Sequence, residues 1–517
     1  MNAIIWLIMP FAMAIGLALA LTPLVARSAG ALDLYDSPDG DRRMHNLPVP
    51  RLGGVGVYLV AAVVSCFVFV FGRSISPFVS PVTLGDKQIG ILTGAFLGSG
   101  LLFLVGLVDD VRGLSPRVKS LAQLIAAGIV WYFGLRVGSI ALGYGDGVST
   151  GILGFPLLLL WIMGVTNAFN FIDGLNGLAA GIAVVACATI AVVAVALGNY
   201  WVLLPTVVVA GGLLGFLPYN FPQAKIFLGD SGSLSIGFLL AVFSIGGSTT
   251  RNGTLLVVVP VLAVFVPLLD GALAIIRRWL RHVPLSGADA RHIHHRLLAL
   301  GLSKERTAII LWSLAAGMSG FGLLIALTAP FVAASVAILG LVGVSVLVIY
   351  GTNLLSYHEL VVAGEVILSG PSRARRVISD QIKAVDLIQK VQRATTVGDV
   401  SEILSDAAAS FGFLGIELTG EDLALDRIAD HILSANWAWK LDYPIRIAGD
   451  EKSVAYVLSI WCSPQQSARP YGAERVARLL GPALQRWFEH RARGTHTPAR
   501  VSLATSLAKR RRLRVTR

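Results

Sequence analysis

Residues 89–116 run IGILTGAFLGSGLLFLVGLVDDVRGLSP. Residues 89–108 carry no charged side chain, and about twenty apolar residues are what a helix needs to cross the hydrocarbon core of a bilayer. Asp109 and Asp110 follow directly, and Ser115-Pro116 is a helix-start signal. The segment therefore predicts a membrane-spanning helix that delivers two carboxylates to one membrane surface, with a second helix after it.

The composition of the whole chain agrees with a membrane protein. Of its 517 residues, 55% are hydrophobic and only 14% are charged, whereas soluble domains contain about a quarter charged residues. Its mean hydropathy is +0.73, which excludes an ordinary soluble globular protein. Cys66, Cys187 and Cys462 are too widely separated for a disulfide framework or a Cys-rich metal site. The net charge of +12 would suit a nucleic-acid partner, but the hydrophobic runs favour a membrane partner. No nucleic acid is expected, because no groove-reading motif accompanies the charge.

The criterion of about twenty apolar residues predicts about eleven spans, and so an all-α polytopic membrane protein. The spans lie near 3–22, 53–72, 89–108, 118–134, 152–170, 177–198, 200–219, 231–249, 254–276, 307–328 and 330–351. Lys and Arg crowd the loops after the first, third, seventh and ninth spans, and positive loops stay in the cytoplasm. We therefore expect the N-terminus outside and everything after residue 352 in the cytoplasm.

Polar residues collect in the loops assigned to the cytoplasm, as a catalytic face requires. They are Asp109, Asp110, Asn167, Asn170, Asp173, Asn176, Asp230, Asp270, His292, His294 and His295. Adjacent carboxylates such as Asp109 and Asp110 need a cation or a metal nearby, unless the loop is solvated and one acid caps the next helix. The segment LGDSGS around Asp230 suits a pyrophosphate bridged by a divalent cation, because a helix start offers free N–H groups. A capped turn is the alternative there.

Two further segments are candidates for holding phosphates. ADARHIHHRLL, residues 288–298, gathers three histidines beside arginines. Those arginines repel a dication, so phosphate binding is preferred to zinc, with a solvated interfacial loop as the alternative. The loop from Asp33 to Arg51, which includes His45, is either part of a phosphate site or an anchor that keeps this loop in the cytoplasm.

Taken together, five ordered segments resemble the polyprenyl-phosphate N-acetylhexosamine-1-phosphate transferase family. They are PRLGGVGV at 50–57, GLVDDVRGLSPRVKSLAQ at 106–123, NAFNFIDGLNGLAAG at 167–181, IFLGDSGSLSIGF at 226–238 and DARHIHHRLLALGLS at 289–303. The resemblance implies transfer of a sugar 1-phosphate, GlcNAc-1-phosphate first among the options, from a UDP-N-acetylhexosamine to undecaprenyl phosphate. It further implies release of UMP, initiation of a cell-envelope polysaccharide at the bacterial plasma membrane, and Mg²⁺ as cofactor, with Mn²⁺ as a substitute.

The resemblance also implies roles for particular residues. Asp109 and Asp110 would be catalytic, and Asp230 and Asp173 would bind the metal. The substrate-binding set would be Asn170, Lys119, His292, His294, His295, Arg296, Arg51 and His45. Asn176 replaces the second acid of the family's frequent DGLDGL sequence, so no carboxylate acts there.

Several alternatives stay open at this point. The HIHH sequence favours a simple UDP-N-acetylhexosamine over the UDP-MurNAc-pentapeptide of peptidoglycan synthesis, which is the alternative donor. A membrane transporter and an inactive lipid-binding scaffold are the alternatives from other classes. Direct attack of the lipid phosphate, assisted by Asp109 or Asp110, is preferred to a covalent aspartyl intermediate, because a phosphate with a second pKa near ~6 has little proton to lose.

The C-terminal third differs from the transmembrane transferase domain, residues 1–352. We expect an amphipathic helical connector over 353–395, a small cytoplasmic α+β domain over 396–491 and a disordered basic tail over 492–517. Helices are predicted over 401–411 and 473–491, and a hairpin over 437–463 around the turn residues AGDEKS. This order is similar to small sensory domains such as GAF. An interaction or dimerisation module, in a homodimer, is the plainer interpretation.

Overall fold

A computed structural model of the chain shows two compact units, and each is described by itself. One comprises residues 1–278 and 284–356, and the other comprises 279–283 and 357–517. The described residues are 2–32, 34–36, 49–75, 84–141, 147–281, 292–328, 383–384, 386–420, 423–425, 439–446, 455–462 and 470–492. His45, the expected span over 330–351 and most of the basic tail lie outside them.

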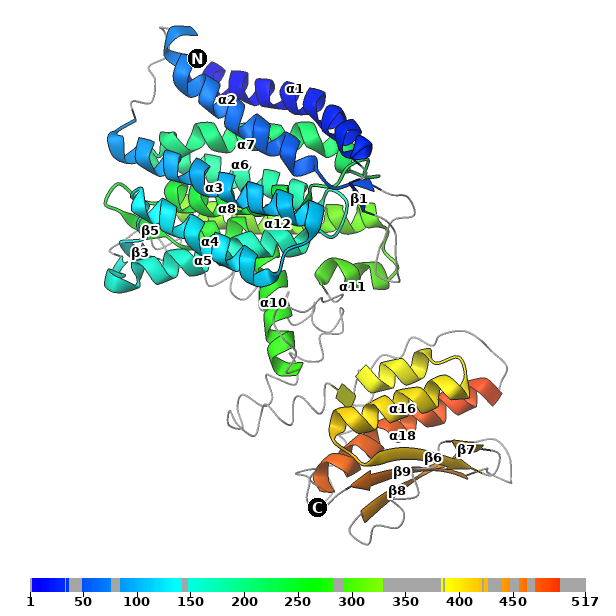
Figure 1. The fold of residues 1–517 in the computed structure, drawn as a ribbon. Coiled ribbons are helices and arrows are strands. Elements are labelled where there is room, and N and C mark those ends of the chain that lie inside the picture. Colours follow the sequence, from blue (N-terminus) through cyan, green and yellow to red (C-terminus); the bar gives the residue numbers. More distant parts are fainter. Residues whose placement is uncertain are drawn as a thin grey trace. The chain divides into compact units, whose positions relative to one another are not determined.

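The first unit is a bundle of helices (Figure 1). They are α1 (Asn2–Ala31), α2 (Gly53–Ile75), α3 (Asp86–Arg112), α4 (Pro116–Tyr132), α5 (Gly154–Ile172), α6 (Leu178–Leu197), α7 (Tyr200–Asn220), α8 (Gly229–Ser248), α9 (Val258–Ala263), α10 (Phe265–Arg281), α11 (Ile293–Ala299) and α12 (Lys304–Leu327). Seven helices of the described residues are long and apolar enough to cross a membrane. The prediction of a polytopic helical membrane protein is confirmed.

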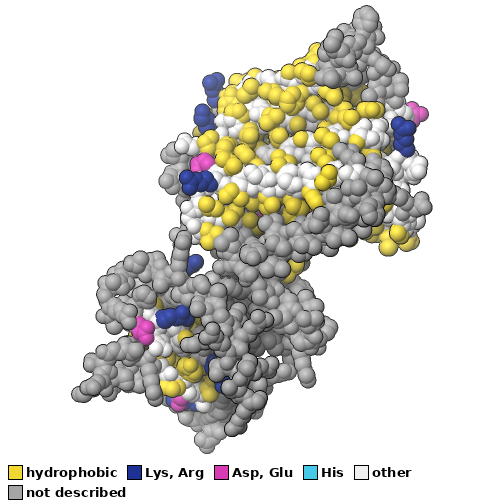
Figure 2. All heavy atoms as spheres, turned by 180° about the vertical axis from the view of Figure 1, so that it is seen from behind, with side chains coloured by type: hydrophobic (Ala, Val, Ile, Leu, Met, Phe, Trp, Pro, Cys, Tyr) yellow, Lys and Arg dark blue, Asp and Glu magenta, His cyan; other side chains and the backbone are white. Residues whose placement is uncertain are grey.

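The flank of this bundle is apolar. Figure 2 shows hydrophobic side chains spread across one face of the unit, with Lys and Arg at its two edges. Leu160 is 69% exposed and Leu104 is 57% exposed. So much exposed apolar surface is stable only against lipid.

One helix of the bundle, α8, lies inside it. Every residue from Ser231 to Ser248 is buried, and α2, α3, α5, α6 and α7 pack around it (Figure 1). Small residues allow this close packing of helices in a membrane. Within α8, Ser235 Oγ donates to the carbonyl of Ser231 at 2.6 Å and Ser244 Oγ donates to that of Ala241 at 2.9 Å.

The expected span over 254–276 is not a single helix. It divides into β5 (Thr254–Leu256), α9 and α10. The helix is interrupted at Val264, and Pro267 in the first turn of α10 has no N–H for the bond to the carbonyl of Ala263 that a continuous helix would make. β5 instead pairs with β3 (Ser139–Ala141), which also pairs with β4 (Val148–Ser149).

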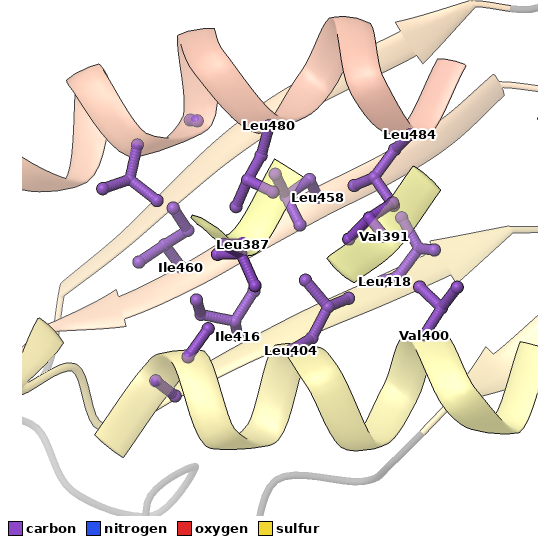
Figure 3. Packing of buried hydrophobic residues seen from close by; sticks show 14 of the residues in the cluster. Leu387, Val391, Val400, Leu404, Ile416, Leu418, Leu458, Ile460, Leu480 and Leu484 are labelled. Carbon is purple, nitrogen blue, oxygen red and sulfur yellow. The ribbon is translucent and has the colours of Figure 1, made fainter. Parts of the chain in front are cut away.

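The second unit contains an antiparallel sheet in the order β7-β6-β9-β8. Its elements are α16 (Val397–Phe411), β6 (Gly415–Gly420), β7 (Leu423–Leu425), β8 (Trp439–Arg446), β9 (Ala455–Cys462) and α18 (Pro470–Ala492). The predicted hairpin is confirmed, because Trp439 pairs with Cys462 and Arg446 with Ala455. Figure 3 shows Leu404 of α16 and Leu480 of α18 packed with Leu458 of β9 in one core.

Candidate active site at the start of α8

Backbone hydrogen bonds bring two of the five motifs together at the start of α8. β1 (Tyr35–Asp36) pairs with β2 (Val49–Pro50), and the Pro50 carbonyl then accepts the N–H of Phe227 at 2.8 Å. Gly53 donates to the carbonyl of Phe227, and Gly54 donates to that of Leu228. Main-chain hydrogen bonds therefore hold the PRLGG segment against the residues that precede α8.

Two carboxylates accept hydrogen bonds from the first backbone N–H groups of α8. Asp110 accepts the N–H of Asp230 at 2.8 Å and the N–H of Ser231 at 3.0 Å, one on each oxygen. Asp173 accepts the N–H of Gly229. Helix starts carry such unsatisfied donors, and carboxylates stabilise them. The N–H groups that we expected to be free for a pyrophosphate are thus taken, so that expectation is corrected.

Two glycines let other helices touch this first turn. A Cβ at Gly54 of α2 would lie 2.1 Å from the nitrogen of Gly232, and one at Gly106 of α3 would lie 2.4 Å from the carbonyl oxygen of Asp230. Both contacts are with backbone, which cannot move aside as a flexible side chain does. The first turn of α8 is therefore fixed by α2 and α3 as well as by its capping acids.

The Asp230 carboxylate faces two other helices. Lys119 Nζ of α4 lies 2.7 Å from Asp230 Oδ2 and 3.0 Å from Asp109 Oδ2, so one ammonium joins the two acids. Asn170 Nδ2 of α5 donates to Asp230 Oδ1 at 2.9 Å and to Ser233 Oγ at 3.0 Å. The structure thus brings together Asp109, Asp230, Lys119 and Asn170, which come from three separate motifs.

A second polar pair lies one helical turn away from Lys119 on α4 and from Asn170 on α5. Gln123 Nε2 donates to Asn167 Oδ1 at 3.1 Å, and Asn167 Nδ2 donates to Gln123 Oε1 at 2.8 Å. Gln123 is fully buried, so this amide pair links the two helices that present Lys119 and Asn170. Gln123 was not among the residues predicted for the site, although its spacing of four residues from Lys119 places it on the same helix face.

Asp173 lies in an acidic environment that disfavours its own ionisation. Burial raises the pKa of its carboxyl well above the ordinary value, and the neighbouring charges of Asp230 and Asp110 act in the same direction. Carboxylates gathered in this way favour a bound cation. Asp173 thus lies close to Asp230 and Asp110.

The acids can be tested for their fit to a divalent metal. Among the described residues, no group of three or more His, Cys, Asp or Glu side chains is placed to hold a metal ion. Magnesium does not require such a group, since it is commonly held by one or two carboxylates together with substrate phosphates and water. Asp109 and Asp230 already hold one cation between them, the ammonium of Lys119. Their hard oxygen ligands therefore fit magnesium.

The histidine segment lies against the end of α5. Asp270 Oδ2 of α10 lies 2.8 Å from His292 Nδ1, and the His292 ring is 5.8 Å from that of Phe171. His294 Nε2 would lie 2.9 Å from a Cβ at Gly174, which follows Asp173. Burial lowers the pKa of His294 to about 3, with the His295 charge acting in the same direction. The histidines thus adjoin the acidic cluster.

The remaining predicted residues occupy less central positions. The backbone carbonyl of Arg51 is next to Gly229, 2.2 Å from where a Cβ would stand. The His295 ring lies beside that of His294, with centroids 4.4 Å apart and an angle of 35° between the ring planes, and Arg296 lies in α11. Asn176 donates to the carbonyl of Pro222 at 3.0 Å, which is a bond in the surrounding loop.

Comparison with known proteins adds to this geometry. The model of glycosyl transferase family 4 matches residues 92–248. A probable undecaprenyl-phosphate N-acetylglucosaminyl 1-phosphate transferase of Bacillus subtilis is 35% identical over 309 residues, which are 59% of this chain and 81% of that protein. The chain belongs to the polyprenyl-phosphate N-acetylhexosamine-1-phosphate transferase family. It is therefore a membrane enzyme, and the acidic cluster at α8 lies inside the matched region.

Other members of the family are also similar. A decaprenyl-phosphate N-acetylglucosaminephosphotransferase of Mycobacterium leprae is 34% identical, over 58% of this chain and 79% of that protein. A phospho-N-acetylmuramoyl-pentapeptide-transferase of Streptococcus pneumoniae is 34% identical, over 40% of this chain and 62% of that protein. Coverage thus extends further along the two N-acetylglucosamine relatives than along the muramoyl relative.

Proposed function

We propose that this enzyme transfers N-acetylglucosamine 1-phosphate from its UDP derivative to a polyprenyl phosphate and releases UMP. The observation that carries the proposal is the meeting of Asp109, Asp173 and Asp230, from three motifs, around one turn of a helix buried in a membrane bundle. Such a place gives a lipid phosphate and a water-soluble nucleotide access to the same acids. The names of the relatives with the greater coverage support N-acetylglucosamine as the sugar.

The acids have different roles in this proposal. Asp110 uses both oxygens to hold the backbone of α8, so it orients Asp230 and does not take a proton. Asp109 keeps an oxygen toward Lys119 and Asp230, where reacting phosphates are drawn to the ammonium. Asp109 is therefore our candidate for the carboxylate beside the reacting groups.

A magnesium ion, when bound by Asp230 with Asp109 or Asp173 nearby, supplies positive charge that offsets the charge of the donor diphosphate. Lys119 contributes a second positive charge at the same place. Asn170 fixes the rotamer of Asp230 through its 2.9 Å hydrogen bond, so the carboxylate is oriented before substrate arrives.

The reaction is a substitution at the sugar-linked phosphorus. An oxygen of the lipid phosphate forms the new P–O bond, the P–O bond to UMP breaks, and UMP leaves with the electron pair. At neutral pH a phosphate monoester with a second pKa near ~6 is largely ionised. Direct attack therefore needs no covalent enzyme intermediate. Charge stabilisation by Lys119 and the acid-bound cation is the main contribution of the site.

The product would start a cell-envelope polysaccharide. The loops with most Lys and Arg adjoin the acidic cluster in sequence, and these loops stay in the cytoplasm. We therefore place the site at the cytoplasmic face of the bacterial plasma membrane, where UDP-sugars are made, and the N-terminus outside.

A transfer assay tests the proposal. Purified full-length protein in detergent is given undecaprenyl phosphate, magnesium and radiolabelled UDP-GlcNAc, UDP-GalNAc or UDP-MurNAc-pentapeptide. Asp230→Ala is the inactive variant. Asp86→Asn, an exposed acid at the opposite end of α3, is the matched control.

The proposal expects label from UDP-GlcNAc in the lipid phase, stoichiometric UMP, and loss of both with Asp230→Ala but not with Asp86→Asn. Preference for the pentapeptide nucleotide would move the enzyme to peptidoglycan synthesis. Transfer from no donor would overturn the proposal and favour a lipid-binding scaffold or a transporter.

A further inference from the structure

Asp270 is a buried acid with no place in the roles given so far. It lies on α10 and is 2% exposed. A carboxylate so far from water is retained in a fold only when hydrogen bonds satisfy it.

Both oxygens of Asp270 contact the start of α11. Oδ2 lies 2.8 Å from His292 Nδ1, and Oδ1 accepts the N–H of Ile293 at 2.8 Å. Because an ionised carboxylate can only accept hydrogen bonds, Nδ1 carries the proton of the His292 ring. One side chain therefore sets the tautomer of His292 and the beginning of α11.

His294 is held by this arrangement in an unusual state. It is 1% exposed, and neither of its ring nitrogens has a hydrogen-bond partner among the residues that the structure describes. Its ring stacks parallel to that of His292, with centroids 5.9 Å apart, and its Nε2 abuts Gly174. Buried polar atoms without partners are rare, and a ligand is one way to supply the partner.

We propose that Asp270 is a positioning residue for phosphotransfer, holding His294 beside Asp173 through His292 and the first turn of α11. The group that His294 receives is a phosphoryl oxygen, to which an imidazole N–H donates. That oxygen belongs to the donor diphosphate or to the acceptor phosphate. The inference rests on the proposed function.

The variants are chosen to separate position from stability. Asp270→Ala removes both bonds. Asp270→Asn keeps two bonds, because its carbonyl accepts from Ile293 and its amide donates to His292 Nδ1, but it forces the other tautomer of His292. The control is Asn199→Ala, which loses two hydrogen bonds, to the carbonyls of Gly247 and Thr249. These carbonyls are at the far end of α8, about 28 Å along the helix from Asp230.

The decisive measurement is a double-variant cycle on the full-length enzyme. Asp270→Ala and His294→Ala should each lower kcat/KM about 10- to 100-fold, by analogy with the loss of groups that orient metal ligands. The double variant should be no slower than His294→Ala alone, because Asp270 acts through His294. Asn199→Ala should leave kcat/KM unchanged. Asp270→Asn should unfold at the wild-type temperature yet lose activity.

The separate KM values for UDP-GlcNAc and polyprenyl phosphate identify which phosphate His294 meets. If the fold-losses of kcat/KM in the two single variants multiply in the double variant, the inference is overturned. Wild-type activity of Asp270→Asn would overturn it as well. If the wild type transfers nothing, the proposed function fails. In that case the affinity of each substrate for the same variants is measured by calorimetry. Unchanged affinities for both substrates would overturn the positioning role of Asp270.

Discussion

Asp109 and Asp110 are neighbours in the chain, yet successive side chains on a helix point about 100° apart. Asp110 therefore meets the backbone of α8, while Asp109 meets Lys119. The adjacency of two acids in GLVDDVRG predicted a catalytic pair without showing which acid does which task. That division depends on where α8 lies, and sequence spacing within α3 carries no information about it.

Asp110→Asn and Asp109→Asn should therefore differ in their effects on stability and on transfer activity. An asparagine at 110 can accept only one of the two N–H groups and opposes the other with its own amide, at a cost of about 1–3 kcal/mol. Asp110→Asn should lower the unfolding temperature and transfer together. Asp109→Asn should lower transfer with a smaller loss of stability. Thermal unfolding and single-turnover transfer of both variants check this, and equal stability losses would contradict it.

Lys119 occupies the place between two carboxylates that a divalent cation would share. Lys119→Met removes a competitor for that place, and one such ion pair is worth up to about 1 kcal/mol. The magnesium concentration for half-maximal activity should fall up to about fivefold, while maximal activity also falls because a positive charge is lost. Magnesium titration of transfer activity measures both quantities. An unchanged or higher half-maximal concentration would contradict the competition.

At the scale of elements, the long apolar runs predicted the helices well. The hairpin of the second unit followed from its turn residues, and the helices predicted over 401–411 and 473–491 correspond to α16 and α18. The sequence did not predict the division of 254–276, since apolar length alone does not reveal that Pro267 interrupts the backbone bonds. It also could not show that α8 has no lipid-facing side, because neighbours set burial.

The packing of α2 and α3 against α8 makes a prediction at this scale. Gly54→Ala and Gly106→Ala place a Cβ within 2.1 and 2.4 Å of backbone atoms of α8, and overpacking of this kind costs about 1–3 kcal/mol or more. Both variants should unfold at lower temperature and lose transfer. Gly128→Ala on α4, where no atom lies within 4 Å, is the control. It should be neutral or slightly stabilising. Thermal unfolding in detergent provides the comparison.

At the scale of the whole molecule, the acidic cluster and the described histidines belong to the first compact unit. The five motifs predicted this membership, because all of them precede residue 304. The loops assigned to the cytoplasm predicted that these acids collect at one membrane face. The direct contact between segments 120 residues apart, such as those of Asp110 and Asp230, has no local signal in the sequence. Asp270 had no motif to mark it, and its partner is 22 residues away.

Removal of the second unit should therefore spare the chemistry. A chain ending at residue 356 should insert in membranes and transfer label at the wild-type rate per folded molecule. Asp230→Ala in the short chain is the control for background transfer. Loss of transfer from a folded short chain would show that the second unit contributes to the reaction.

The burial of α8 also bears on how the enzyme is made. During translation α8 leaves the ribosome after α2, α3, α5, α6 and α7, the five earlier helices against which it packs. With five serines and no lipid-facing side, it is poorly suited to wait alone in a bilayer. Its insertion between helices already synthesised is also the step that unites Asp110, Asp173 and Asp230. We therefore expect a nascent chain to acquire its active site only when α8 packs between these helices.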